Sequence, residues 1–460
     1  MESPSLPRRR SHRTAGEERR VSEGEGSKGE RERGQSRASR RLAGEEEDIA
    51  NIYPPPPYLD SDQITCPSTS TRAIHSWFES SLWMMARWCV GWPAAARGGR
   101  DELTWQAELT AHAAGEFSMA AAQANAVMED QAQVMASPGA TLVGVYDGHG
   151  GPDASRFLRS RLFPLIHEFA AERGGAVDAD VIRKAFLAAD EEYLQLLRWS
   201  LPNMSRAAAS GSCCLLGAIS GDTLYVANAG DSRAVLGRRA AAGQTVAERL
   251  STEHNVASEE VRRELAALHP DDGEVVVHAR GAWRVKGIIQ VARAIGDVYL
   301  KTPEFKRDPA VQRLCSAAAA VELARPVVTA EPSIHARKLK AGVDLFVVFA
   351  SDGLWEHISD EAAVQLVSKS STRRGVAARL VQAALGEAAR KREVRRCDLR
   401  RIERGVRRHF HDDITAVVVF LDLDDDGGRR ARRRGRVVDS SSSSCSNTPL
   451  DVYSLYNSTA

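Results

Sequence analysis

Four short acidic clusters, each next to an apolar run, are the residues of this sequence best placed to do chemistry. They are Glu129-Asp130, DGHGG at 147–151, SDG at 351–353 and Asp412-Asp413. Carboxylates gathered inside one fold repel each other and lose hydration, so a group of them needs a compensating positive charge. Hard divalent cations, which prefer oxygen ligands, supply that charge. The sequence therefore predicts a site for divalent metal ions.

The apolar runs beside the clusters are typical of buried strands, because they are short, rich in β-branched or aromatic residues, and bounded by polar or glycine turns. These runs are residues 142–146, 345–350 and 414–421. Asp147 and Asp352 follow the ends of their strands, whereas Asp412 precedes the start of its own. Antiparallel pairing of the strands would bring the three carboxylates to the same edge of a sheet.

Each cluster taken alone has a structural alternative. Asp-Gly is a common hairpin turn, and an acidic residue beside a strand is usually part of a solvated turn. Motif matches also carry false positives. The interpretation therefore depends on the combination of the four clusters and on no single one of them.

The order of the motifs resembles that of the metal-dependent Ser/Thr protein phosphatases of type 2C. The resemblance covers residues 116 to about 424 and is carried by MED at 128–130, VYDGHGG at 145–151, VANAGDSRA at 226–234, VARAIGD at 291–297, FASDGLW at 349–355 and DDIT at 412–415. Two longer stretches, at 284–300 and 405–414, are similar to a plant subgroup called clade D. The resemblance implies an α+β fold: two packed antiparallel β-sheets flanked by helices, an α-β-β-α sandwich, with a binuclear metal site at one edge.

The resemblance also implies the ligands of two Mg²⁺ or Mn²⁺ ions. Asp147 would bridge the two ions and the backbone carbonyl of Gly148 would ligate one of them. Asp352 and Asp412 would ligate the other ion. Asp412 takes this role because the family's ligand comes first in the acidic pair, which leaves Asp413 to support the site from the second shell.

Four further acidic residues match the motifs of the same family. Glu129 and Asp130 would hold metal-bound waters. Asp231 matches a residue that helps to bind a weaker third metal ion, and Asp297 matches another acid near that region. A turn-stabilising role is the alternative for Asp231 and Asp297.

The reaction that the resemblance implies is hydrolysis of phosphoserine and phosphothreonine in signalling proteins. Two metal ions a few ångströms apart can lower the pKa of a shared water and aim the resulting hydroxide at phosphorus. His149 is suited to protonate the departing oxygen, because imidazole titrates near neutral pH and lies two residues from Asp147. A structural histidine is the alternative. Gly148, Gly150 and Gly151 would leave room for backbone and phosphate near the metals.

One position departs from the family. Many members carry an arginine that grips the substrate phosphate five residues before the Asp of the Glu-Asp pair, where this chain has Asn125. A neutral amide cannot replace a bidentate, charged guanidinium. The candidates to replace it are Arg233, Arg293 and Lys286; alternatively, phosphate binding depends more on the metals.

Two rival functions stay open at this point. The first is a phosphatase-like scaffold that has lost most of its turnover, an idea to which Asn125 gives some support. The second is a two-metal phosphodiesterase, since the same metal chemistry acts on diesters. The sequence has no basic surface interleaved with aromatic residues that would favour the second.

Composition places the chain in a broad class. It has 460 residues and a formal net charge of +1, which gives no bias toward nucleic acid. Its seven cysteines are scattered and form no C-x-x-C pair, which favours a reducing, intracellular compartment. We find no secretory signal and no run long enough to span a membrane. The expected partners are phosphoprotein substrates, and we expect a monomer.

The chain divides into four parts by composition. Residues 1–75 are predicted to be a disordered polar tail, 76–108 an apolar leader with tryptophans, 109–424 the catalytic domain and 425–460 a disordered C-terminal tail. Residues 77–92 suit a helix that packs on the domain or, alternatively, contacts the plasma membrane peripherally or a partner protein. Arginine runs at 8–10 and 432–434 would suit nuclear import, with a solvated charge run as the alternative, so the nucleus and the cytoplasm are both expected locations. A further hypothesis is that the residues before Met84 or Met85 are a dispensable extension or follow from a misassigned upstream start.

Periodicity predicts the remaining elements of the domain. Residues 181–197 and 360–370 have helical apolar spacing, whereas 223–229 and 275–278 are typical of strands. The basic stretch at 390–408 is predicted to be a solvated helix and loop, with anionic docking as the alternative.

Overall fold

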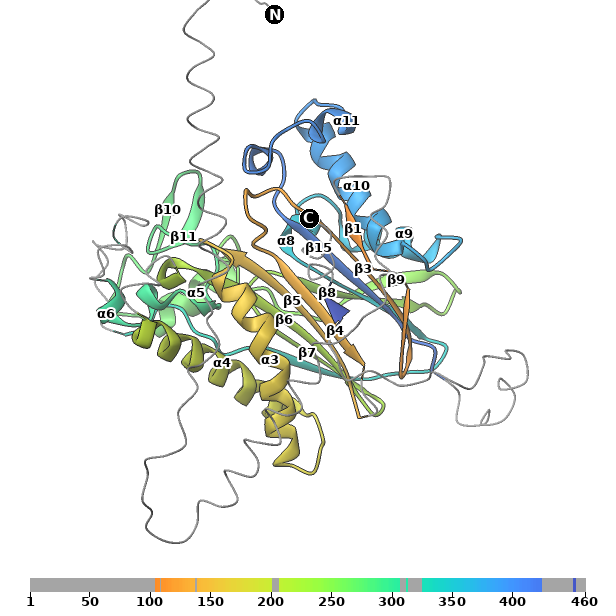
Figure 1. The fold of residues 1–460 in the computed structure, drawn as a ribbon, viewed down its shortest axis with the longest axis horizontal. Helices are drawn as coiled ribbons and strands as arrows, with labels where there is room; N and C mark the ends of the chain where they lie inside the picture. Colours follow the sequence, from red (N-terminus) through yellow and green to blue (C-terminus); the bar gives the residue numbers. More distant parts are fainter. Residues whose placement is uncertain are drawn as a thin grey trace, which may run out of the picture. The chain divides into compact units, whose positions relative to one another are not determined.

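The structure is a computed structural model that describes residues 104–107, 109–136, 139–200, 207–306, 312, 325–423 and 450–451 (Figure 1). The predicted tail at 1–75 and nearly all of the leader and of the C-terminal tail lie outside the described residues. Met84 and the arginine runs at 8–10 and 432–434 lie outside them too.

Two antiparallel sheets form the centre of the domain. The first has the strand order β1-β3-β15-β14-β8-β9, with β2 paired to β3. Its strands are β1 Trp105–Gln106, β2 Thr110–His112, β3 Gly115–Ala122, β8 Arg233–Arg239, β9 Thr245–Arg249, β14 Asp344–Ala350 and β15 Ile414–Phe420. The second has the order β13-β7-β6-β5-β4-β16, with β12 paired to β6. Its strands are β4 Gln131–Ala136, β5 Thr141–His149, β6 Gly211–Ser220, β7 Thr223–Ala229, β12 Ile295–Gly296, β13 Ser333–Lys338 and β16 Leu450–Asp451.

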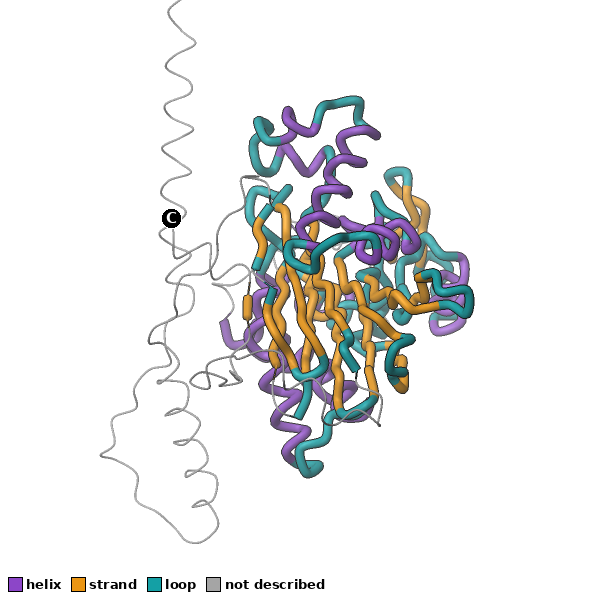
Figure 2. The backbone as a smooth tube through the Cα atoms, turned by 90° about the vertical axis from the view of Figure 1, so that its right-hand side faces the viewer, coloured by secondary structure: helices purple, strands orange, loops and turns teal. Residues whose placement is uncertain are grey.

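Helices cover the outer face of each sheet (Figures 1 and 2). Helices α3 Asp153–Ala171 and α4 Ala179–Ser200 pack on the second sheet, and α9 Asp360–Ser368 and α10 Val376–Lys391 pack on the first. Helix α5 Glu259–Leu268 contacts the small hairpin of β10 Val276–Ala279 and β11 Ala282–Val285. Short helices α6 Pro303–Lys306, α8 Asp352–Trp355 and α11 Arg396–Leu399 and 3-10 turns at Ala207–Ala209, Val298–Leu300 and Val406–His409 complete the described part. The expected α-β-β-α sandwich is confirmed.

The central strands are apolar throughout because both of their faces are buried. In β15, Val417 and Val419 lie in the core between the two sheets, whereas Val418 and Phe420 lie in the core under α9 and α10. Side chains of a strand alternate between the two faces of its sheet, so one apolar run serves two cores. A third core lies between the second sheet and helices α3 and α4.

Most of the predicted elements are confirmed with small shifts at their ends. Strand β7 has the predicted bounds, the helix predicted at 360–370 ends at Ser368, and the strand predicted at 275–278 lies one residue later. The prediction that Asp147 follows its strand is wrong. Strand β5 continues to His149, because Asp147, Gly148 and His149 still pair with Cys213, Ser212 and Gly211 of β6.

The prediction of a solvated stretch at 390–408 is wrong at Arg407. This side chain is buried, and it donates hydrogen bonds to the carbonyl oxygens of Gln123 (2.7 Å) and Ile402 (3.0 Å). Buried charged groups need such partners. Arg407 therefore ties the basic stretch to the loop after β3.

Candidate metal centre and active site

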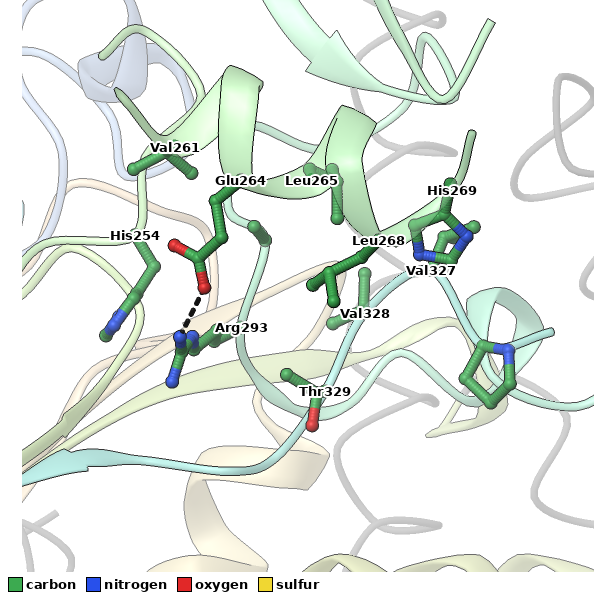
Figure 3. Close-up of a pocket in the computed structure, with 12 residues that line it drawn as sticks. His254, Val261, Glu264, Leu265, Leu268, His269, Arg293, Val327, Val328 and Thr329 are labelled. Carbon is green, nitrogen blue, oxygen red and sulfur yellow. Dashed lines mark hydrogen bonds and ion pairs between the residues drawn. The ribbon is translucent and has the colours of Figure 1, made fainter. Parts of the chain in front are cut away.

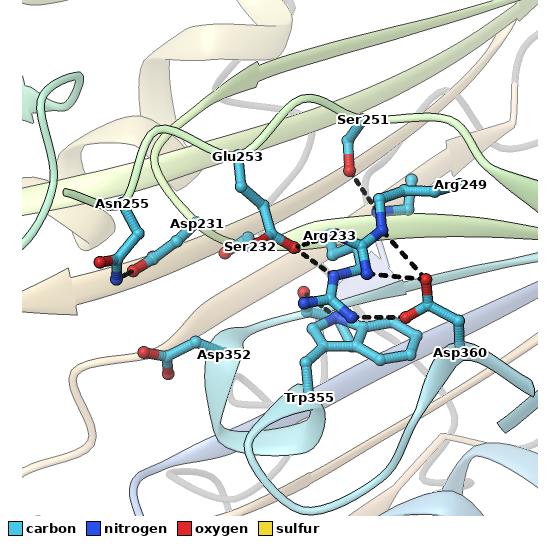
Figure 4. Close-up of polar contacts among 12 residues, drawn as sticks. Asp231, Ser232, Arg233, Arg249, Ser251, Glu253, Asn255, Asp352, Trp355 and Asp360 are labelled. Atoms are coloured by element: carbon cyan, nitrogen blue, oxygen red, sulfur yellow. Dashed lines mark hydrogen bonds and ion pairs between the residues drawn. The ribbon is translucent and has the colours of Figure 1, made fainter. Parts of the chain in front are cut away.

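Three carboxylates from distant parts of the chain converge at the edge of the sandwich. Asp147 lies near the end of β5, Asp231 in the turn between β7 and β8, and Asp352 at the start of α8. One carboxylate oxygen from each lies within 4.8 Å of the others. Figure 4 shows Asp231 and Asp352 close to each other. We call these three residues the acidic triad.

The triad joins the two sheets. Asp147 belongs to the second sheet, while Asp352 follows β14 of the first. The prediction that these carboxylates meet at the edge of one sheet is therefore wrong in that detail. The stacking of two sheets, and not strand pairing alone, brings them together.

The electrostatics of the triad fit a cation. Burial raises the pKa values of Asp147 and Asp352 well above their usual range, and neighbouring carboxylates raise them further. Within the described residues, the buried Oδ1 of Asp352 has no hydrogen-bond donor. Buried carboxylate oxygens that lack donors are suited to hold a hard cation such as Mg²⁺ or Mn²⁺. The donor set of the triad therefore fits the predicted metals.

Asp412 lies beside the triad and is not a member of it. Its Oδ2 forms an ion pair with Arg408 Nη2 at 2.6 Å, and its Oδ1 accepts hydrogen bonds from Asn125 Nδ2 (3.3 Å) and from the backbone N–H of Asp413 (2.7 Å). Burial raises the pKa of Asp412 to about 6, although Arg408 opposes the shift. The charge of Asp412 in turn raises the pKa of the triad residue Asp352.

Two glycines allow backbone segments to touch at this edge. A Cβ atom on Gly148 would lie 2.5 Å from the carbonyl oxygen of Glu129, and one on Gly353 would lie 2.1 Å from that of Asp413. Both distances are too short for any side chain. The close approach thus brings Glu129 next to β5 and Asp413 next to α8.

Asp413 anchors the loop that carries Glu129. Its Oδ1 accepts hydrogen bonds from the backbone N–H groups of Ala124 (2.6 Å) and Asn125 (3.0 Å), and its Oδ2 accepts one from Glu129 (2.8 Å). The residue is almost fully buried. Sequence reasoning placed Asp413 near the site without this contact set, because its partners lie more than 280 positions away.

We expect Asp413→Ala to lower the free energy of unfolding by about 3 to 5 kcal/mol, because one buried and two part-buried N–H groups would lose a charged acceptor. Urea unfolding in EDTA measures this loss without a contribution from bound metal. The control is Asp222→Ala, which removes an exposed carboxylate paired to Lys338 and should leave stability close to wild type. Equal stability of the two variants would contradict the anchoring role.

Glu129 and Asp130 end the loop between β3 and β4. Burial, with Asp413 and Asp412 adding to it, raises the pKa of Glu129 to about 7. Asp130 is buried, and its Oδ2 accepts a hydrogen bond of 2.7 Å from the Ser351 hydroxyl. Asp130 thereby connects the loop to the turn that precedes Asp352.

His149 is oriented by a buried carboxylate. Its Nε2 donates to Oδ2 of Asp297 at 2.8 Å, and Oδ1 of Asp297 accepts a hydrogen bond of 3.2 Å from the Tyr299 hydroxyl. The Asp297 side chain is fully buried, whereas that of His149 is 29% exposed. Burial lowers the pKa of His149, but Asp297, together with Asp231 and Glu129, raises it, and the net shift is upward. Sequence reasoning associated Asp297 with the metal region and missed this pairing.

Arg233, a candidate for phosphate binding, is held by two carboxylates (Figure 4). Its guanidinium forms ion pairs with Glu253 and Asp360 and lies 5.1 Å from the centre of the Trp355 ring. Its charge is therefore already balanced. Asp360 also pairs with Arg249 at 2.9 Å.

The other two candidates are paired as well. Arg293 lies in a small pocket beside α5, where it contacts Glu264 at 2.8 Å (Figure 3). It also donates to the carbonyl oxygen of Glu331 at 3.0 Å. Lys286 contacts Asp272 at 2.6 Å. All three candidate cations thus have carboxylate partners.

Three contacts at the site were not predicted from the sequence. Asp231 accepts hydrogen bonds from Asn255 Nδ2 at 2.7 Å and from the Cys213 thiol at 3.2 Å. Arg408 contacts Asp412. The only sequence signal for Cys213 was its place in an apolar run, and Arg408 was hidden in a stretch dense in basic residues.

The sequence of the chain is similar to those of known protein phosphatases. The family model of protein phosphatase 2C matches residues 110–393. "Probable protein phosphatase 2C 34" of Oryza sativa subsp. indica is 64% identical over 371 residues, which are 80% of this chain and 94% of that protein. "Probable protein phosphatase 2C 63" of Arabidopsis thaliana is 57% identical over 338 residues, 73% of this chain and 86% of that protein. A solved serine-threonine phosphatase 2C from Toxoplasma gondii has 17% identity and a TM-score of 0.49, covering 69% of this chain and 99% of that chain.

The chain therefore belongs to the protein phosphatase 2C family. Its activity is the metal-dependent hydrolysis of phosphoserine and phosphothreonine in proteins, and Mg²⁺ or Mn²⁺ is the metal of this family. In the described part of the chain, no helix has both the length and the apolar composition needed to cross a bilayer.

Proposed function

We propose that Asp147, the Gly148 carbonyl, Asp352 and Asp412 hold two Mg²⁺ or Mn²⁺ ions, with Asp231 contributing to a weaker third site. The observation that carries the proposal is the convergence of the acidic triad, in which the buried Oδ1 of Asp352 lacks a donor among the described residues. When bound, such ions neutralise phosphate oxygens and lower the pKa of a bound water, so that it can lose a proton near neutral pH.

The chain's own side chains complete the site. Glu129 and Asp130 would accept hydrogen bonds from waters around the ions, and the contacts of Asp413 and Ser351 hold them in place. His149 protonates the departing serine or threonine oxygen. Asp297 supports this role because its buried carboxylate orients the imidazole and favours the protonated ring.

The test of this function is phosphate release from a phosphothreonine peptide. We expect release that requires Mn²⁺ or Mg²⁺ and stops in EDTA. Absence of release with either metal, in a protein that binds Mn²⁺, would favour the scaffold alternative. Faster cleavage of a phosphodiester than of the phosphopeptide would favour the phosphodiesterase alternative.

We also propose the domain limits and the subgroup. A catalytic domain at 109–424 is supported by the family match at 110–393 and by the described core. The tails at 1–75 and 425–460 and the leader at 76–108 rest on composition. Membership of plant clade D rests on the stretches at 284–300 and 405–414 and agrees with the plant relatives.

Monomeric state and location are proposals of the same kind. We propose a monomer in the nucleus or cytoplasm, with peripheral contact of residues 77–92 with the plasma membrane as the alternative. Light scattering on purified protein tests the first point. Mass spectrometry of the native protein tests the start near Met84, since abundant peptides from earlier residues would contradict it.

A further inference from the structure

Arg408 is the arginine that contacts a proposed metal ligand in the described structure. It lies in the 3-10 turn Val406–His409, and its Nη2 is 2.6 Å from Oδ2 of Asp412. Asn125 Nδ2 contacts the other oxygen of the same carboxylate at 3.3 Å. The guanidinium of Arg408 and the neutral amide of Asn125 therefore lie on the two sides of Asp412.

The environment of Arg408 differs from that of the three cations considered earlier. Its side chain is 52% exposed, whereas those of Arg233, Arg293 and Lys286 are 15%, 18% and 10% exposed. Those three have carboxylate partners that are not proposed as metal ligands. Arg408 is thus both accessible and next to the centre.

Asp412, the partner of Arg408, is also a proposed metal ligand. A carboxylate that ligates a cation has its charge largely neutralised and attracts a nearby guanidinium less strongly. The N–H donors of Arg408 are then available to an anion at the centre. A planar guanidinium can give two parallel hydrogen bonds to phosphate oxygens, a geometry that lysine and asparagine lack.

An open groove of about 500 Å³ leads to Arg408 and Asp412. Lys391 and Arg392 also line it, together with Glu356, His357, Phe410 and His411. Burial lowers the pKa of His357 to about 4, so the imidazole is neutral at pH 7. The cations Lys391, Arg392 and Arg408 then outnumber the carboxylates Glu356 and Asp412, which favours the approach of an anion.

We propose that Arg408 binds the phosphoryl group of the substrate, in the role that Asn125 cannot fill. This inference rests on the proposed function in that it uses the same centre. The phosphate dianion accepts hydrogen bonds from the guanidinium at the inner end of the groove. No bond is made or broken by Arg408.

The experiment compares Arg408→Ala and Arg408→Lys with wild type at saturating Mn²⁺. Calorimetric binding of inorganic phosphate, which needs no turnover, is the first measurement, and KM and kcat for a phosphothreonine peptide are the second. We expect the alanine variant to bind phosphate at least tenfold more weakly, about 1.4 kcal/mol, with a matching rise in KM. The lysine variant should lose less, because it keeps the charge and loses only the bidentate geometry.

Two further variants distinguish a direct contact between Arg408 and phosphate from a general effect of nearby positive charge. Arg390→Ala removes an exposed arginine of α10 that does not line the groove and should change phosphate affinity less than threefold. Adding Asn125→Arg to Arg408→Ala should restore affinity, because a guanidinium would then approach Asp412 from its other side. Circular dichroism and a thermal melt establish that each variant is folded.

Two outcomes would overturn the proposal. One is an unchanged phosphate affinity in Arg408→Ala. The other is a higher Mn²⁺ requirement with normal phosphate affinity at saturation, which would make Arg408 only a counter-ion of Asp412. If wild type binds phosphate through Arg408 but releases none from phosphopeptides, the proposed function fails and the binding role stands.

Discussion

Asp352→Asn is expected to lower turnover about a thousandfold or more in a protein that still folds. Metal ions contribute several kcal/mol to stabilising charge in such transition states, and each 1.36 kcal/mol corresponds to a tenfold change in rate. Loss of a negative charge from the acidic triad also reduces carboxylate repulsion, so stability without metal should not fall. Asp147→Asn should behave in the same way.

Phosphate release at saturating Mn²⁺ measures the loss of turnover. Thermal melts with EDTA and with Mn²⁺ give a readout that is independent of activity, because a ligand that binds the native state raises the melting temperature. The Mn²⁺-induced rise should shrink in Asp352→Asn and stay normal in the exposed control Asp222→Asn. Near-normal turnover in the triad variants would refute the assignment of ligands.

His149→Ala should slow hydrolysis of phosphothreonine peptides about 10²- to 10⁴-fold, which is the usual contribution of a general acid. An aryl phosphate should be affected much less, because its leaving group departs without a proton. Rates for the two substrates in wild type and variant test this difference. Equal slowing of both would argue against proton donation by His149.

Asp297→Asn is the matched control, because it keeps His149 and removes its anionic partner. Asp297 raises the pKa of His149, so its loss should lower that pKa. The protonated acid would then be lost at a lower pH, and the alkaline limb of the pH profile should shift downward. A purely structural role of Asp297 would lower stability and leave the position of that limb unchanged.

Local sequence was enough to identify most of the strands and helices around the site. Strand β7 and the strands beside Asp352 and Asp412 could be predicted because apolar runs bounded by turn residues are local signals. The end of β5 could not be predicted. It depends on the register of Asp147 to His149 against β6, a strand more than 60 residues away.

The pattern of charged residues indicated which residues lie near the site, but it did not predict their contact partners. Arg407 and Arg408 are neighbours in a basic stretch. Arg407 is buried and donates hydrogen bonds to backbone carbonyls, whereas Arg408 forms an ion pair with Asp412. Asp297 was grouped with the metal region but pairs with His149. Such partners lie far apart in the chain, so no local pattern distinguishes them.

Residue types and short-range periodicity are enough to predict the family motifs, the buried strands and the acidic residues that need a cation. They do not predict that Asp147, Asp231 and Asp352 form one triad, that Asp413 anchors the Glu129 loop or that Arg408 contacts Asp412. These contacts arise where two stacked sheets and their loops meet, and the stacking depends on burial of the whole core, which no short segment encodes.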